Sequence, residues 1–254
     1  MLKQIQADIL TVRISENRPQ LGADATALAA ARLRKLLADR EFLNIVFAAA
    51  PSQNEFLAAL AKEKGIDWSR VRAFHMDEYI GLPEVAPQRF GNYLKKHFFD
   101  LVPLREVHFL QGDAIDPDAE CRRYAELLIR YPVDVVFMGI GENTHIAFND
   151  PHAAMFNDPH MVKVVDLDLA CRQQQVNDGC FRRLEDVPQH ALTLTIPALM
   201  KGDHIFCMVP GKTKAQAVYH TLKSNIHEQY PSTILRTHPS AILFIDQDSS
   251  SLLD

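Results

Sequence analysis

The feature that most constrains the fold is the alternation of short apolar, β-rich runs with segments of helical periodicity along the chain. Eight runs are typical of strands: 44–50, 71–76, 107–110, 133–140, 162–167, 191–196, 204–210 and 241–246. Between them, six segments are typical of helices, most with apolar residues at helical spacing: 23–39, 52–65, 88–100, 116–130, 169–185 and 212–224. Such alternation predicts an α/β fold of modified Rossmann-like type, with a largely parallel sheet flanked by helices on both faces.

The composition is that of one globular domain. The 254 residues are 47% hydrophobic and 23% charged, and no Pro-, Gly- or Ser-rich linker divides them, so we expect a single domain over 1–254. The net charge of -5 and the scattered basic residues give no footprint for nucleic acid or an anionic membrane. No run approaches the ~18 to 20 apolar residues of a membrane span, which predicts a soluble cytoplasmic protein. The four cysteines are widely spaced and are expected to be reduced thiols.

Function is expected where the predicted parallel strands end, because ligands gather at the carboxyl ends of such strands. Three strand ends carry polar or glycine-rich sequence: AAAPSQ, FHMDEY and MGIGENTH. The third stretch ends at His145, and Asp150 follows five residues later, so the two side chains can meet across a short turn. A His with a carboxylate neighbour is typical of a proton shuttle, whereas a loop His bonded to local backbone is the alternative. Gly139 and Gly141 would allow a ligand to approach closely, a weak signal by itself.

The stretch FHMDEY places Asp77 and Glu78 at the end of another strand. Adjacent residues of an extended chain point in opposite directions, so at most one of the two carboxylates is expected to face a common pocket. Asp77 is a candidate general base, and a helix-capping or solvated acidic pair is the alternative.

Two segments could hold an anion. The AAAPSQ stretch could present the Ser52 hydroxyl, with Gln53 beside it, at a helix start, although a simple N-cap at Ser52 explains the sequence equally well. Lys212 and Lys214 open a predicted helix after a strand, where a lysine can reach a phosphate or a carboxylate; surface lysines exposed to water are the alternative.

The word FNDPH occurs twice, at 148–152 and 156–160. With His145, its histidines and aspartates suggest a metal cluster (Asp150, His152, Asp158, His160). A Pro after each Asp forces turns rather than one helical face, so we expect no metal.

Together, FHMDEYIGLP, MGIGENTHIAFNDP and VPGKTKAQAV resemble the glucosamine-6-phosphate deaminase (isomerase) family, in order along nearly the whole chain. The related 6-phosphogluconolactonases share the fold but continue differently after the His. The resemblance implies conversion of an amino sugar phosphate to a ketose phosphate with release of ammonia, without a metal or organic cofactor. It implies that Asp77 moves a proton between carbons 2 and 1, that His145 opens the sugar ring, and that Asp150 stands where the family usually has Glu.

The first FNDPH copy is therefore the chemical one, and the second is expected to be a loop that lines or covers the pocket. Three departures from the family pattern bear on the substrate. Asn143 takes the place of a carboxylate that would support the His, Asp150 is one methylene shorter than Glu, and AAAPSQ replaces a Gly- and Thr-rich phosphate loop. No phosphate-binding Arg stands at a clearly matching position in QQQVNDGCF, so Lys214 is the best-matched phosphate ligand, with Ser52 as a candidate second. Retained catalytic residues beside an altered anion site suggest a changed substrate, either a different or an unphosphorylated amino sugar.

The resemblance leaves two other functions open. One is a lactonase in which His145 activates water; it predicts hydrolysis without ammonia release. The other is a non-catalytic sugar-binding sensor. The expected partner in each case is a small amino sugar or sugar phosphate, and the resemblance also suggests a homo-oligomer.

Overall fold

The computed structural model describes residues 1–253, one residue short of the predicted domain. Eight strands form a sheet in the order β1-β2-β11-β10-β7-β3-β4-β6. Their bounds are β1 Lys3–Ala7, β2 Leu10–Ser15, β3 Leu43–Phe47, β4 Val71–His75, β6 Glu106–His108, β7 Val135–Met138, β10 His204–Val209 and β11 Ala241–Asp246. The pairs from β2 to β6 are parallel, and only the edge pair β1 and β2 is antiparallel.

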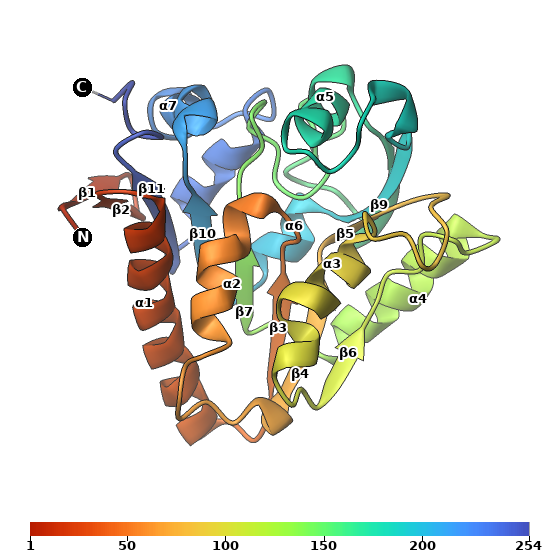
Figure 1. Ribbon diagram of the computed structural model, residues 1–254, viewed down its shortest axis with the longest axis horizontal. Coiled ribbons are helices and arrows are strands. Elements are labelled where there is room, and N and C mark those ends of the chain that lie inside the picture. Colours follow the sequence, from red (N-terminus) through yellow and green to blue (C-terminus); the bar gives the residue numbers. More distant parts are fainter. Residues whose placement is uncertain (254) are drawn as a thin grey trace.

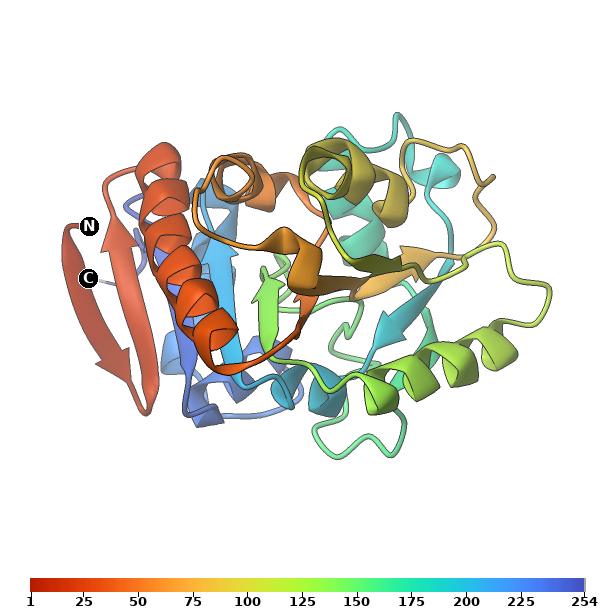
Figure 2. The ribbon, with the colours of Figure 1, turned by 90° about the horizontal axis from the view of Figure 1, so that it is seen from below.

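Helices cover both faces of this sheet (Figures 1 and 2). On one face lie α1 (Arg18–Asp39), α2 (Asn54–Leu60) and α3 (Phe90–His97), and on the other lie α4 (Pro117–Arg130), α6 (Ile196–Met200) and α7 (Ala215–Lys223). Each face has its own apolar core, because alternate residues of the strands point to opposite sides: Ile45 and Phe47 pack in one cluster and Val46 in the other. No helix among residues 1–253 is both long enough and apolar enough to cross a membrane.

The helix starts follow the sequence chemistry. Asn17, Asp116, Asp168 and Thr195 each accept a hydrogen bond from a backbone N–H of the first turn of α1, α4, α5 (Leu169–Asn177) and α6. A Pro occupies the first turn of three of these helices, where its missing N–H costs nothing.

The order of the strands reverses between β3 and β7. From β3 the chain proceeds through β4 to β6 at one edge, then returns to β7 on the other side of β3 and continues outward to β10 and β11. Such a reversal separates the loops that follow the two central strands and leaves a crevice at their carboxyl ends. The fold therefore predicts a binding site beyond Phe47 and Met138.

A second sheet of three antiparallel strands, β5 (Asp77–Tyr79), β9 (His190–Leu194) and β8 (Val162–Asp166), lies beside this crevice. Here the structure differs from the prediction, since the runs 162–167 and 191–196 are strands but do not join the parallel sheet. The helix predicted over 169–185 ends at Asn177, and α1 begins five residues before the predicted 23. The strands β1, β2 and β5 and the helix α6 were not predicted.

Candidate active site

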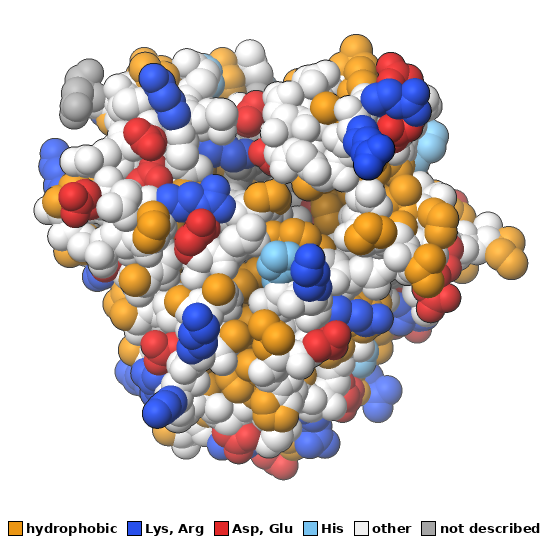
Figure 3. All heavy atoms as spheres, viewed as in Figure 1, with side chains coloured by type: hydrophobic (Ala, Val, Ile, Leu, Met, Phe, Trp, Pro, Cys, Tyr) orange, Lys and Arg blue, Asp and Glu red, His pale blue; other side chains and the backbone are white. Residues whose placement is uncertain are grey.

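A pocket lies at the carboxyl ends of four strands, at the reversal of strand order. Its walls come from the segments after β3, β4, β7 and β10, together with α5 and the first turn of α1. The surface is hollowed between the side of the molecule that carries α7 and the side that carries α5 (Figure 3). The polar lining residues are Arg18, Ser52, Asp77, His145, Gln174, Gln175, Asp178, Thr213 and Lys214.

His145 and Asp150 meet as predicted. The Nδ1 atom of His145 lies 3.0 Å from Oδ1 of Asp150, whose side chain is completely buried. The angle at this contact departs from that of a hydrogen bond, and such contacts often tighten when a substrate binds. Burial acts to raise the pKa of Asp150, but the close imidazole of His145 and the hydrogen bonds from the Asn143 amide and the Asp168 backbone N outweigh it and bring the pKa below its ordinary value. Asp150 is thus an anion placed to orient the imidazole and to stabilise its cation.

Asn143 supports the carboxylate and not the ring. Its Nδ2 donates to Oδ1 of Asp150 at 2.9 Å and to Oδ2 of Asp168 at 3.1 Å, and its Oδ1 accepts from the backbone N of His145 at 3.2 Å. The sequence interpretation had the amide replacing a carboxylate beside the histidine ring. In the structure Asp150 is that carboxylate, and the amide separates it from a second one, Asp168.

Gly141 is required by the packing of the histidine. A Cβ at this position would lie 2.2 Å from Cε1 of His145, far inside contact distance. A Cβ at Gly139 would approach the Gln53 amide to 3.0 Å. The turn is further fixed by the hydrogen bond from Gly141 N to His145 O, 2.9 Å long, and it holds Thr144 at φ +71°, an uncommon conformation for a β-branched residue. The two glycines therefore let the loop fold tightly over the imidazole.

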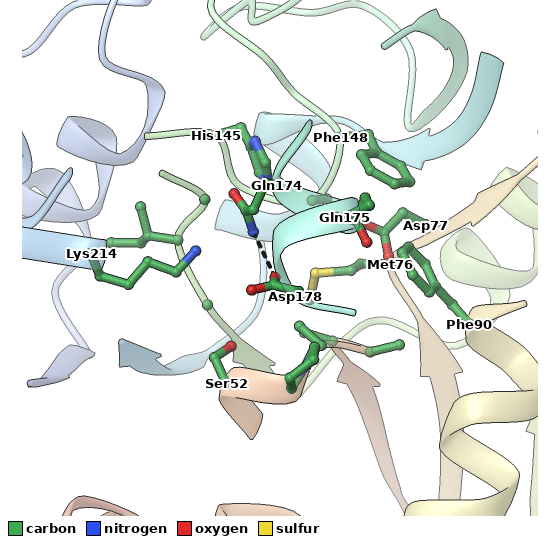
Figure 4. Close-up of a pocket in the computed structure, with 18 of the residues that line it drawn as sticks. Ser52, Met76, Asp77, Phe90, His145, Phe148, Gln174, Gln175, Asp178 and Lys214 are labelled. Atoms are coloured by element: carbon green, nitrogen blue, oxygen red, sulfur yellow. Dashed lines mark hydrogen bonds between the residues drawn. The ribbon is translucent and has the colours of Figure 1, made fainter. Parts of the chain in front are cut away.

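Asp77 faces the pocket from the opposite side to Lys214 (Figure 4). Burial, and secondarily the charge of Glu78, raise its pKa well above the ordinary value. Its backbone is fixed by His75, which accepts from Leu110 N at Nε2 and is therefore the tautomer that donates from Nδ1 to the Asp77 carbonyl, both at 2.9 Å. A buried carboxyl with a raised pKa is suited to taking up and returning a proton.

Glu78 points away from Asp77, as the extended backbone predicted. Its carboxylate accepts hydrogen bonds from the backbone N of Tyr79, Phe90 and Gly91, each at 3.0 Å. Burial raises the pKa of Glu78 to about 7, against these hydrogen bonds and the charge of Arg89. Glu78 thus anchors the start of α3 and leaves the pocket to Asp77.

The predicted anion-binding residues separate into two groups. Lys214 and Ser52 point into the space between His145 and the β3 loop (Figure 4). Burial lowers the pKa of Lys214, and the charges of Asp178 and Glu142 oppose this shift. Ser52 is not an N-cap, since it lies inside the 3-10 turn Pro51–Gln53 and its hydroxyl forms no capping bond.

Gln53 does not reach the pocket. Its side chain is buried, and Nε2 donates to Ser52 Oγ at 3.0 Å and to Met208 O at 3.2 Å. It ties the β3 loop to the end of β10. With Gln53 as donor, the Ser52 hydroxyl keeps its own hydrogen for a ligand.

The pocket residues supplied by α1 and α5 were not predicted from the sequence. Gln174 joins α5 to the histidine loop, since its Oε1 accepts from Glu142 N at 2.9 Å and its Nε2 donates to Asp178 at 3.3 Å. Gln175 and Asp178 also line the pocket, as does Arg18. The polar run QQQVND within a predicted helix could have indicated these residues. This run was considered only because it lacks the arginine that the family resemblance leads one to expect.

The second FNDPH copy does not line or cover the pocket, contrary to expectation. Asp158 is buried and holds Lys163 of β8 at 2.8 Å, and its Oδ1 accepts from His160 N at 3.0 Å. This copy is a structural turn before β8.

The potential metal ligands are also arranged differently from the suggested cluster. Single ligand atoms of His145, Asp150 and Cys171 lie within 4.8 Å of one another, as do those of Asp150, His152 and Asp168. Burial raises the pKa of the Cys171 thiol well above its ordinary value, which disfavours the thiolate that a metal would need.

A doubly wound sheet with a buried carboxyl, a His–Asp pair and a lysine converging on its switch point is the arrangement of an α/β enzyme. The sequence model described as glucosamine-6-phosphate isomerases/6-phosphogluconolactonase matches residues 16–243. The chain belongs to this family.

Individual relatives agree with the family assignment. A glucosamine-6-phosphate deaminase of Exiguobacterium sp. is 38% identical over 190 residues, 75% of this chain and 73% of the relative. One from Halothermothrix orenii is 33% identical over 248 residues, 96% of this chain and all of the relative.

Solved structures place the fold in the same group. A monomeric glucosamine-6-phosphate deaminase superposes with a TM-score of 0.85 at 26% identity, covering 95% of this chain and 99% of that one. A 6-phosphogluconolactonase from Thermotoga maritima shares the fold, with a TM-score of 0.75 at 19% identity over 92% of this chain and 98% of the other.

Proposed function

We propose that the chain is an isomerising deaminase of an amino sugar phosphate such as glucosamine-6-phosphate, releasing ammonia and a ketose phosphate. The observation that carries the proposal is the convergence of Asp77, the His145–Asp150 pair and Lys214 on one pocket. The curated relatives named as glucosamine-6-phosphate deaminases support the same activity.

Each group has a role that its surroundings favour. His145, held by Asp150, donates a proton to the ring oxygen as the bond from this oxygen to carbon 1 breaks and the carbon 1 hydroxyl loses its proton, which gives the open-chain aldehyde. Asp77 then removes the proton from carbon 2 and returns it to carbon 1, while the carbon 1 oxygen takes up a proton from the amino group, which leaves a hydroxyl at carbon 1 and an imine at carbon 2. Water adds to this imine and ammonia leaves, so the net reaction consumes one water. Lys214 and Ser52 hold the phosphate at the other side of the pocket.

Location in the cytoplasm, folding as a single domain and assembly into homo-oligomers stay predictions.

The test is the release of ammonia and ketose phosphate from glucosamine-6-phosphate, with glucosamine and other amino sugar phosphates in parallel. Asp77→Asn should lower turnover by at least about 10²-fold, the lower range for a lost general base, while the circular dichroism spectrum is unchanged. Glu78→Gln is the matched control, because the neighbouring carboxyl lies outside the pocket. Assayed below its Tm, it should retain turnover with a pH profile shifted to lower pH, because the charge of Glu78 contributes to the raised pKa of Asp77.

Three outcomes contradict the proposal. Undiminished turnover in Asp77→Asn would show that this residue does not transfer the proton between carbons 2 and 1. Hydrolysis of 6-phosphogluconolactone without ammonia release would make the protein a lactonase, and tight sugar binding without any turnover would make it a sensor.

A further inference from the structure

The pocket contains a cation that neither the sequence motifs nor the proposed mechanism uses. Arg18 belongs to the first turn of α1, almost 200 residues before Lys214 in the chain, and both line the same cavity. Its Nη2 donates to the carbonyl of Pro51, and its Nε lies 2.7 Å from Oε1 of Glu55. These contacts leave Nη1 without a hydrogen-bond partner among residues 1–253.

The arginines of the segment where the family resemblance expected a phosphate ligand are unavailable. Arg172 uses Nη2 to bind the carbonyls of Leu184 and Val187, at 2.8 and 2.9 Å. Arg183 pairs with Asp186 on the surface. None of the arginines at 172, 182 and 183 lines the pocket. A guanidinium for a phosphate must therefore come from another element.

Lys214 alone is a weak counter-charge for a phosphate. It stands near Asp178 and Glu142, whose charges act to raise the pKa of that lysine and offset its positive charge at this side of the cavity. A phosphate monoester carries about -1.5 to -2 charges at pH 7. Arg18 brings a second cation to this side, and its pairing with Glu55 leaves Nη1 free to donate to such an anion.

We propose that Arg18 binds the phosphate group of the substrate through its free Nη1, together with Lys214 and Ser52. It is thus the residue that makes the pocket specific for a phosphorylated sugar despite the changed AAAPSQ loop. The inference deepens the proposed function and rests on it for the identity of the sugar. Arg18 touches the turn that carries Ser52, so the guanidinium and the hydroxyl reach the anion from the same wall.

The alternative role of Arg18 is structural, since it joins α1 to Glu55 of α2. Three variants separate the two roles: Arg18→Met removes the guanidinium, Arg18→Lys keeps a charge without the planar fork, and Glu55→Gln breaks only the interhelical ion pair. Each is assayed for KM and kcat with glucosamine-6-phosphate, and its affinity for inorganic phosphate is measured by titration calorimetry.

Loss of a charge-assisted hydrogen bond to the phosphate should raise KM about tenfold to hundredfold in Arg18→Met and weaken phosphate binding by a similar factor. The kcat should change by less than about threefold, because the phosphate is bound equally before and during the reaction. Arg18→Lys should be intermediate, and Glu55→Gln should stay within about twofold of the unaltered protein in all three quantities.

Equal losses in Glu55→Gln and Arg18→Met would show that Arg18 acts only through the helix contact, and an unchanged KM in Arg18→Met would overturn the proposal directly. If the unaltered protein releases no ammonia but binds inorganic phosphate in an Arg18-dependent manner, the deaminase function fails while the assignment of Arg18 holds. An unaltered protein that binds no phosphate overturns the assignment itself.

Discussion

At the scale of the residue, the site consists of carboxyl groups whose surroundings give them different protonation. Asp150 is buried among donors that favour its anion, whereas Asp77 is buried with its carboxyl facing only the pocket and favours the neutral form. The separation of two carboxyl groups in this way divides the roles of orienting anion and proton carrier between them. The Asn143 amide contributes because it donates to both Asp150 and Asp168 and keeps two like charges apart.

The raised pKa of Asp77 implies that the ionised form of this carboxyl lowers the free energy of unfolding. A carboxyl whose pKa is higher in the folded than in the unfolded chain contributes stability below its unfolded pKa of about 4, and this contribution is lost as pH rises through the folded pKa. Asp77→Asn removes this titration. The variant should therefore gain stability over the unaltered protein as pH rises from about 4 to 8, by about 1.4 kcal/mol for each unit by which the pKa is raised.

Urea denaturation at several pH values between 4 and 8 measures this difference. A constant difference across the range would mean that Asp77 titrates normally in the folded protein, and its role as a proton carrier near neutral pH would lose its physical basis.

Residue-scale prediction from the sequence succeeded where a strand end delivers a side chain directly. Asp77, His145 and Lys214 follow β4, β7 and β10 by a few residues, so parallel-sheet geometry was enough to bring them together. Gln53 also follows a strand, but the 3-10 turn rotates its side chain into the protein. Arg18 also follows the end of a parallel strand, β2, but neither β2 nor the early start of α1 was predicted, so the residue was missed.

At the scale of the element, the packing of α1 on α2 depends on a glycine in a helix. A Cβ at Gly22 would lie 2.7 Å from Cβ of Glu55 and 3.0 Å from its backbone carbon. A glycine inside a helix costs about 0.5 to 1 kcal/mol relative to alanine, so its presence here indicates that close approach of the helices matters more than helix propensity.

Gly22→Ala should therefore destabilise the protein by about 1 to 3 kcal/mol, the usual cost of overpacking, in spite of the gain in helix propensity. Because α1 carries Arg18 and α2 carries Glu55, the KM for a phosphorylated substrate should rise as well. Thermal denaturation and steady-state kinetics give the two quantities. A more stable Gly22→Ala variant would show that the helices separate without loss.

Element prediction failed where the pattern along the chain does not identify a partner. The strands β8 and β9 have the expected apolar runs, but periodicity does not distinguish a parallel neighbour from an antiparallel one. The edge strand β1 alternates polar residues with half-buried ones and offers no apolar run, so nothing marked it. The early start of α1 depends on the Asn17 cap and the Pro that follows, a signal that precedes the apolar periodicity.

At the scale of the whole molecule, the pocket joins two sheets that share cores. Asp77 belongs to β5 of the small sheet, whereas His145 and Lys214 follow strands of the large one. Leu192 and Leu194 of β9 pack in the same cluster as Val46 and Val136 of the large sheet. A substrate that contacts Asp77, His145 and Lys214 together bridges both sheets, which sequence patterns of single elements could not reveal.

The shared cores predict that the sheets unfold together, and the bridging site predicts that substrate stabilises both at once. The Asp77→Asn protein, which should bind glucosamine-6-phosphate and consume it at least about 10²-fold more slowly, should unfold in one transition, and ligand at about 100 times its Kd should stabilise it by about 2.7 kcal/mol. Calorimetry follows the transition, and hydrogen exchange should slow in both β5 and the loop after β7. Lys214→Met in the same background is the control, and the same concentration of ligand should stabilise this protein much less. Two transitions, only one of which moves with ligand, would show that the sheets are energetically separate and that the substrate contacts one of them alone.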